Sequence, residues 1–265
     1  MYKLLALDID GTLLNSKGEV CSTTLESVEE AKKHGVMVTI STGRPIQGVY
    51  KYIDMLGLQA PIITYNGAMI VDSVSNEIIY EQGLESKDAK QILDLGIDYG
   101  ISIIIWSNNQ LYVNRIDENV NNYKKLSRIE PIIVENYDEI ITQGITKVLW
   151  IDEVEKVNAM MSDLEGRINK SVTFCTSKAN YLEFFDERVS KANALERIGK
   201  HYQILRDEMM AIGDGDNDLT MIDYVGLGVA MENATPNVKK VAQFITSSND
   251  NEGISNAIKK FIIEA

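Results

Sequence analysis

The sequence has few of the features of an extracellular, membrane-bound or nucleic-acid-binding protein. Only two of its 265 residues are cysteines, Cys21 and Cys175, too few for a disulfide framework and without any metal-ligand spacing. No apolar run reaches the roughly 18 residues of a membrane span, and the short apolar stretch before Asp8 does not resemble a signal peptide. The formal net charge is −13, which disfavours binding to nucleic acid or anionic lipid. We expect a cytoplasmic protein with no nucleic-acid or membrane partner.

Two carboxylates, Asp8 and Asp10, follow directly on an apolar run at the start of the chain. A run that is apolar throughout is typical of a strand buried on both faces. Alternate side chains of a strand share a side, so the two carboxylates would repel each other unless a cation or hydrogen-bond donors are nearby. Gly11 allows a sharp turn, and Thr12 can hold it. The pair predicts a metal site, although Asp-Gly at a strand end also fits an ordinary turn.

The first third of the chain alternates between strand and helix patterns. Apolar β-branched runs at 36–40 and 61–64 follow helical patterns at 22–34 and 46–56. This alternation predicts a parallel sheet with helical crossovers.

The pattern changes between residues 83 and 184. Helical patterns at 84–99 and 153–168 stand beside paired strand patterns at 101–114 and 172–185, which suggests an inserted α+β unit. The alternation typical of a parallel sheet returns from Ser190 onward.

Polar residues stand at the ends of several of the predicted parallel strands. Asp8 and Asp10 follow the first, Ser41-Thr42-Gly43-Arg44 the second, and Asp214 a later one at 209–212. Ligands bind in open parallel sheets beyond the carboxyl ends of the strands, so these residues predict one shared site. The hydroxyl-rich turn before a predicted helix N-terminus also suits a phosphate group.

Some of these residues also fit other interpretations. Residues 214–218 alternate Asp and Asn like the start of an EF-hand loop, but the twelfth position of that loop is Val225 rather than Glu, which excludes a calcium loop. Taken singly, Thr42 also fits a helix cap, and Lys191 a surface lysine.

Four motifs together resemble those of the haloacid dehalogenase superfamily of phosphotransferases. They are Asp-Ile-Asp-Gly-Thr at 8–12, Ser-Thr-Gly-Arg at 41–44, Lys191, and Gly-Asp-Gly-Asp-Asn-Asp at 213–218. Tyr-Asn-Gly-Ala at 65–68, Val-Ala-Met-Glu-Asn-Ala at 229–234 and the insertion are similar to the Cof-type branch of metabolite phosphatases.

The resemblance implies an α/β fold: a Rossmann-like, doubly wound parallel sheet core with an inserted α+β cap. Residues 1–82 and 185–265 would form the catalytic core, and residues 83–184 the cap that sets substrate specificity. Two positions depart from the family pattern or vary within it. Ala192 follows Lys191 where the family usually has Gly, and Asp216 stands at a variable position.

The resemblance also implies roles for the residues of the core. Asp8 would be the nucleophile that forms an aspartyl-phosphate, and Asp10 the general acid and base. Bonds to the transferring phosphoryl group would come from the residues Thr42, Gly43, Lys191 and Asn217, of which Asn217 would contact phosphate or orient Lys191.

The metal ligands implied by the resemblance are Asp8, the backbone carbonyl of Asp10, and Asp214. This all-oxygen set suits Mg²⁺. Asp218 would fix the orientation of the ligands.

The sequence therefore predicts an Mg²⁺-dependent phosphatase that hydrolyses small phosphorylated metabolites, such as sugar phosphates or cofactor phosphates. Three alternatives remain open: a phosphomutase, a binding module regulated by a phosphorylated aspartate, and a catalytically idle sugar-phosphate sensor. The second carboxylate, Asp10, counts against the binding module, because it should hydrolyse an aspartyl-phosphate quickly. No motif in the insertion identifies the substrate, and nothing in the sequence indicates the oligomeric state.

Overall fold

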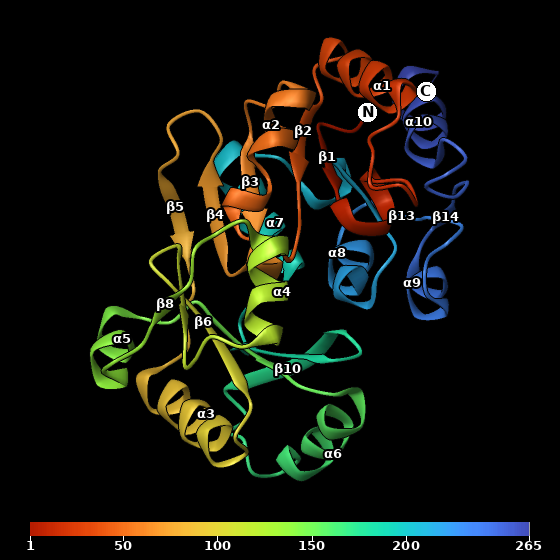
Figure 1. Cartoon of the computed structure of the whole chain (residues 1–265). Helices are drawn as coiled ribbons and strands as arrows, with labels where there is room; N and C mark the ends of the chain where they lie inside the picture. The colour runs from red at the N-terminus through yellow and green to blue at the C-terminus, as the bar shows by residue number, and fades with distance from the viewer. Residues whose placement is uncertain (265) are drawn as a thin grey trace. The chain divides into compact units, whose positions relative to one another are not determined.

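The computed structural model describes residues 1–264 and divides the chain into two compact units (Figure 1). Unit 1 comprises Met1–Gly43, Val49–Ile79 and Ser190–Ala265; unit 2 comprises Arg44–Gly48 and Tyr80–Val189. The sequence placed the insertion at 83–184, close to the long segment of unit 2. The short segment Arg44–Gly48 had been expected in the core, so the chain passes between the units four times rather than twice.

A five-stranded parallel sheet forms the centre of unit 1, as the strand-helix alternation predicted. Its strands, in spatial order, are β14 (Phe244–Ile245), β13 (Leu227–Ala230), β12 (Met209–Gly213), β1 (Leu4–Leu7) and β2 (Met37–Ile40). All four residues of β1 are fully buried, which explains why that stretch is apolar throughout. The predicted α/β fold with a parallel sheet is confirmed.

The order of the strands reverses at β1. The chain moves from β1 outward to β2, and its last third adds β12, β13 and β14 on the other side. The strand ends are level: Leu7 pairs with Ile212 of β12 and with Ile40 of β2. Ligands bind at such a reversal in open parallel sheets, so the residues that follow these three strands meet at one edge.

Within residues 1–264, six α-helices of unit 1 connect or flank these strands (Figure 1). Helix α1 lies against α10, and α7 lies against α8. Helix α7 begins where the side chain of Ser190 accepts a hydrogen bond from the backbone N–H of Asn193, an N-cap that fixes Lys191 as the first helical residue. The helices are α1 (Ser22–Lys33), α2 (Tyr50–Leu56), α7 (Lys191–Tyr202), α8 (Leu219–Tyr224), α9 (Pro236–Val241) and α10 (Gly253–Ile258).

The strand predicted at 61–64 is present as β3 (Pro61–Thr64), but it does not extend the parallel sheet as a full strand. It pairs antiparallel with β4 (Met69–Asp72), and β5 (Ile78–Glu81) completes this three-stranded sheet. A single parallel bridge, Ser41 to Ile63, links β3 to the segment after β2. The turn between β3 and β4 thereby lies beside the residues that follow β2.

Unit 2 contains a six-stranded mixed sheet and is an α+β unit, as expected. The spatial order is β10, β11, β9, β6, β7, β8, and only β7 and β8 run parallel. The strands are β6 (Ser102–Ser107), β7 (Gln110–Val113), β8 (Ile132–Ile133), β9 (Lys147–Ile151), β10 (Val172–Lys178) and β11 (Tyr181–Asp186).

Helices α3 (Ser86–Asp98), α5 (Tyr137–Gln143) and α6 (Val154–Leu164) share one hydrophobic core with this sheet. Trp150 and Phe184 lie in it. Helix α4 (Glu118–Ser127) packs against β6 through Tyr123, whose hydroxyl accepts a hydrogen bond from the indole N–H of Trp106 at 2.9 Å.

Two further features of unit 2 were not predicted. Lys147 and Glu183 form an ion pair of 2.9 Å between β9 and β11, and both side chains are nearly inaccessible to solvent. The short helical turn η2 (Ile46–Gly48) also belongs to this unit, where the Gln47 amide donates to the carbonyl of Asn109 at 2.9 Å. None of the helices formed by residues 1–264 is both long enough and apolar enough to span a membrane.

Candidate active site

A buried lysine joins the ends of three elements in unit 1. Lys191 is 0% exposed, and its ammonium group lies 2.7 Å from Oδ1 of Asp8, which is 4% exposed and follows β1. The same ammonium group donates to the carbonyl of Ser41 after β2, at 2.8 Å, and to Oδ1 of Asp218 after β12, at 2.5 Å. All three donor positions of the ammonium group are therefore used.

Three carboxylates gather around this lysine. Asp8, Asp214 and Asp218 each offer one oxygen, and these oxygens lie within 4.8 Å of one another. The hydroxyl of Thr12 donates to Oδ1 of Asp214 at 2.7 Å and so fixes that carboxylate. Gly11 makes this approach feasible: a Cβ atom there would lie 2.2 Å from Oδ2 of Asp214, and its φ of +86° disfavours any other residue.

Asp218 is fully buried and uses both of its oxygens. Oδ2 accepts hydrogen bonds from the backbone N–H groups of Asp214, at 2.9 Å, and Gly215, at 3.0 Å, while Oδ1 contacts Lys191. One side chain thus holds both the loop that carries Asp214 and the ammonium group beside Asp8. Asp218, Asp8 and the carbonyl of Ser41 together hold the ammonium group of Lys191.

The electrostatics of the cluster favour a bound cation. Burial raises the pKa of Asp8 well above its usual value, the charge of Asp218 raises it further, and Lys191 opposes both effects. Burial likewise raises the pKa of Asp214 to about 6. Burial lowers the pKa of Lys191, but the charges of Asp218 and Asp8 outweigh it and raise that pKa overall. One ammonium group faces three carboxylates, and these oxygen donors fit a magnesium ion.

The residues predicted to bind phosphate follow β2. Ser41 and Thr42 are buried, and their backbone N–H groups donate to the carbonyls of Leu7, at 2.8 Å, and Ile63, at 3.0 Å. The hydroxyl of Ser41 has no hydrogen-bond partner among residues 1–264. A buried donor of this kind at the sheet edge is available to a ligand.

The prediction of a helix at 46–56, directly after these residues, is wrong for its first turn. Residues 46–48 form the 3₁₀ turn η2, and α2 begins only at Tyr50. The reason lies in unit 2, where the contact of Gln47 with Asn109 holds the segment. No α-helix N-terminus therefore stands immediately behind Gly43.

The remaining predicted residues lie on exposed turns of unit 1. Asp10 is exposed, in the turn η1 (Ile9–Leu13) after β1. Asn217 is exposed, and its amide donates to Oδ1 of Asn66 at 3.0 Å. Gly43 packs against the carboxamide of Asn66, because a Cβ atom at Gly43 would lie 2.9 Å from Oδ1 of Asn66.

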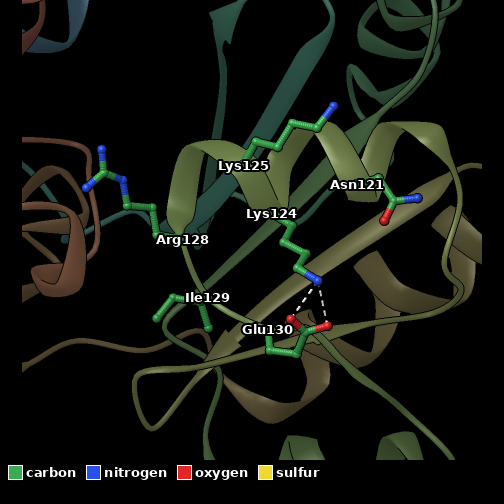
Figure 2. Close-up of a pocket in the computed structure, with 6 residues that line it drawn as sticks. All are labelled: Asn121, Lys124, Lys125, Arg128, Ile129 and Glu130. Carbon is green, nitrogen blue, oxygen red and sulfur yellow. Dashed lines mark hydrogen bonds and ion pairs between the residues drawn. The ribbon is translucent and has the colours of Figure 1, made fainter.

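A pocket of about 410 Å³ lies in unit 2, at the C-terminal end of α4 (Figure 2). Figure 2 shows Lys124 reaching the carboxylate of Glu130, whereas Lys125 and Arg128 point away from it. Lys125 donates to the side chain of Asn122. Cations in the last turn of a helix also offset its dipole, so this lining has a structural explanation and assigns no chemistry by itself.

Comparisons with known proteins agree with the geometry of unit 1. The profile of the haloacid dehalogenase-like hydrolases matches residues 5–258, nearly the whole chain. The chain belongs to this family. The membership expected from the four motifs is confirmed.

Similar proteins of the family cover the chain from end to end. "Putative phosphatase YxeH" of Bacillus subtilis (strain 168) is 34% identical over 268 residues, 99% of this chain and 99% of that protein. "5-amino-6-(5-phospho-D-ribitylamino)uracil phosphatase YitU" of the same organism is 27% identical over 263 residues, 97% of each. The solved structure of the "HAD Subclass IIB Sugar Phosphatase BT4131" has a TM-score of 0.84 at 25% identity, and the match covers 98% of this chain and 98% of that chain.

Sequence reasoning on this haloacid dehalogenase-like hydrolase missed the roles of three site residues. Thr12 was expected only to hold a turn, yet it fixes Asp214. Asn233 donates to the carbonyl of Gly11 at 2.8 Å, and Asn66 accepts from Asn217. Asn66 and Asn233 lie in the two segments at 65–68 and 229–234 that resemble the Cof-type branch, so that resemblance was the signal that could have found them.

Proposed function

We propose that the protein is a phosphatase that hydrolyses small phosphorylated metabolites through an aspartyl-phosphate on Asp8. The observation that carries the proposal is the buried contact of 2.7 Å between Lys191 and Oδ1 of Asp8, within a cluster of three carboxylates. Oδ2 of Asp8 makes no hydrogen bond with any residue between 1 and 264, so one oxygen is held while the other remains available to attack phosphorus.

The first step forms a bond between an oxygen of Asp8 and phosphorus and breaks the bond from phosphorus to the substrate oxygen. The leaving alcohol takes a proton from the carboxyl group of Asp10. In the second step a water molecule gives a proton back to Asp10 and attacks phosphorus, which releases inorganic phosphate and restores Asp8. Asp10 is exposed, in contrast to the buried Asp8, so the two carboxylates have the different environments that two different roles require.

Charge neutralisation comes from the groups around Asp8. Lys191, the backbone N–H of Gly43 and the side chain of Thr42 would stabilise the phosphoryl oxygens, and Asn217 would bind the same group. Mg²⁺, held by Asp8, the carbonyl of Asp10 and Asp214, would supply further positive charge when bound.

The substrate class rests on the relatives. The printed names of similar proteins include a phosphatase of a phosphoribityl-aminouracil and a sugar phosphatase. We therefore propose sugar phosphates or cofactor-pathway phosphates as substrates, with unit 2 serving as the cap that selects among them. A cytoplasmic location fits such metabolites.

The test measures phosphate release from a panel of sugar, nucleotide and cofactor monophosphates, with Mg²⁺ and with a chelator. Wild-type protein is compared with Asp8→Asn and with Asp216→Asn, an exposed carboxylate of the same turn as Asp218. We expect metal-dependent release that Asp8→Asn abolishes and Asp216→Asn retains. Full activity of Asp8→Asn would refute the nucleophile. Turnover that requires a bisphosphate activator and releases no phosphate would indicate a mutase instead.

A further inference from the structure

The turn between β3 and β4 has an unusual backbone conformation. Tyr65, Asn66 and Gly67 have φ values of +50°, +57° and +102°, so three consecutive residues occupy the left-handed region. Glycine adopts it freely and asparagine tolerates it, but a buried tyrosine does so only where its surroundings impose it. Conformations of this kind persist at functional sites more often than elsewhere.

The turn is held by the residues that follow β2 and by the start of α7. The backbone N–H of Asn66 donates to the carbonyl of Thr42 at 2.9 Å. Gly67 contacts the start of α7. A Cβ atom at Gly67 would lie 2.2 Å from the carbonyl oxygen of Ser190, the residue that caps this helix. The turn therefore contacts two of the segments that supply the proposed active site.

The side chain of Asn66 adds a third connection. Its Oδ1 accepts the hydrogen bond of 3.0 Å from Nδ2 of Asn217 and lies against the Cα atom of Gly43. Asn217 is confined on its other side, because a Cβ atom at Gly215 would lie 2.5 Å from Oδ1 of Asn217. The two carboxamides join the turn between β3 and β4, which packs against Gly43 of the loop after β2, to the loop after β12.

We propose that Asn66 is a positioning residue of the active site: it orients the carboxamide of Asn217 toward the phosphoryl group and fixes the spacing of the two loops. This inference rests on the proposed function, because it assumes that Asn217 binds phosphate. Asn217 has no hydrogen-bond partner other than Asn66 among residues 1–264, so the bridge is what holds its exposed side chain in one orientation.

The test substitutes Asn66→Gly, which removes the carboxamide but retains a backbone that accepts positive φ. The matched control is Asn76→Gly, because Asn76 has a φ of +61° and is exposed in the turn between β4 and β5, away from the site. Asn217→Ala and the double variant Asn66→Gly/Asn217→Ala complete a double-mutant cycle. Each protein is assayed for kcat/KM and for the Kd of inorganic phosphate in the presence of Mg²⁺.

We expect Asn66→Gly to lower kcat/KM and weaken phosphate binding by about tenfold or more, since small misplacements of binding groups have effects of this size. Asn76→Gly should remain within about twofold of wild type. If Asn66 acts through Asn217, the double variant loses no more than Asn217→Ala alone.

Two results would overturn the inference. One is an Asn66→Gly variant that matches Asn76→Gly in both measurements. The other is a double variant whose loss equals the product of the two single losses, which would show that Asn66 acts independently of Asn217. Failure of the proposed function looks different, since wild-type protein would then release no phosphate from any substrate. The phosphate Kd values would still decide the role of Asn66.

Discussion

The contact of Asp218 with Lys191 gives a quantitative prediction for Asp218→Asn. The substitution keeps the shape of the side chain and removes its charge. An asparagine must present its NH₂ group either to the ammonium group of Lys191 or to the backbone N–H groups of Asp214 and Gly215, so a donor faces a donor in either orientation.

The magnitude follows from burial. Removing one partner of a buried ion pair typically costs about 3–5 kcal/mol. Lys191 keeps Asp8 and the carbonyl of Ser41, and the loss of the Asp218 charge relieves repulsion on Asp8. We therefore expect a somewhat smaller loss, about 2–4 kcal/mol in the stability of unit 1. Phosphatase activity should fall by about 10–100-fold, the usual effect of removing a group that orients metal-site ligands.

The assay must report on unit 1. Both tryptophans, Trp106 and Trp150, lie in unit 2, so tryptophan fluorescence reports on the unfolding of unit 2 and not of unit 1. Hydrogen exchange of the slowest amides in β1 and β12, measured with a chelator present, gives the free energy of opening of the relevant strands. Asp216→Asn is the control: it alters an exposed carboxylate that accepts from Thr235, and should cost less than about 1 kcal/mol. Unchanged protection in Asp218→Asn would refute the role assigned to Asp218.

Three further predictions concern the metal site and unit 2. Burial raises the folded-state pKa values of Asp8 and Asp214, so the metal-free fold loses stability as pH rises through about 6. Mg²⁺ should therefore raise the melting temperature more at about pH 7.5 than at about pH 5. Equal shifts at the two pH values would contradict this prediction. Thr12→Val should weaken Mg²⁺ affinity by about 10–100-fold, whereas Thr12→Ser keeps the hydroxyl and should bind nearly normally in a calorimetric titration. Lys147→Met and Glu183→Leu should each destabilise unit 2 by about 3–5 kcal/mol, measured by urea unfolding followed by tryptophan fluorescence. The double variant should regain most of that stability. Additive losses would contradict a stabilising ion pair between Lys147 and Glu183.

The sequence predicted those features that depend on local patterns. The apolar run before Asp8 indicated β1, and strand ends in a parallel sheet share one edge, so Asp8, Thr42 and Asp214 could be placed together before the structure was known. The second ion-pair partner of Lys191, Asp218, could not be predicted in the same way, because it lies 27 positions away and the contact depends on the packing of α7.

Tertiary contacts decided the remaining differences. The two-residue strand β8 is too short to have a recognisable pattern, and it exists because β7 offers it a parallel edge. The predicted helix at 46–56 loses its first turn to the contact between Gln47 and Asn109. Neither contact leaves a periodic signal in the sequence.

The short segment Arg44–Gly48 has a consequence for protein engineering. Transplanting residues 80–189 from a relative in order to change substrate preference would replace Asn109 and α4 but leave Gln47 behind. The graft would then present a foreign surface to a native loop that begins directly after Gly43. A chimera that takes both segments, 44–48 and 80–189, from the same donor keeps that loop with its own partners. We expect this chimera to be more stable than one that exchanges residues 80–189 alone.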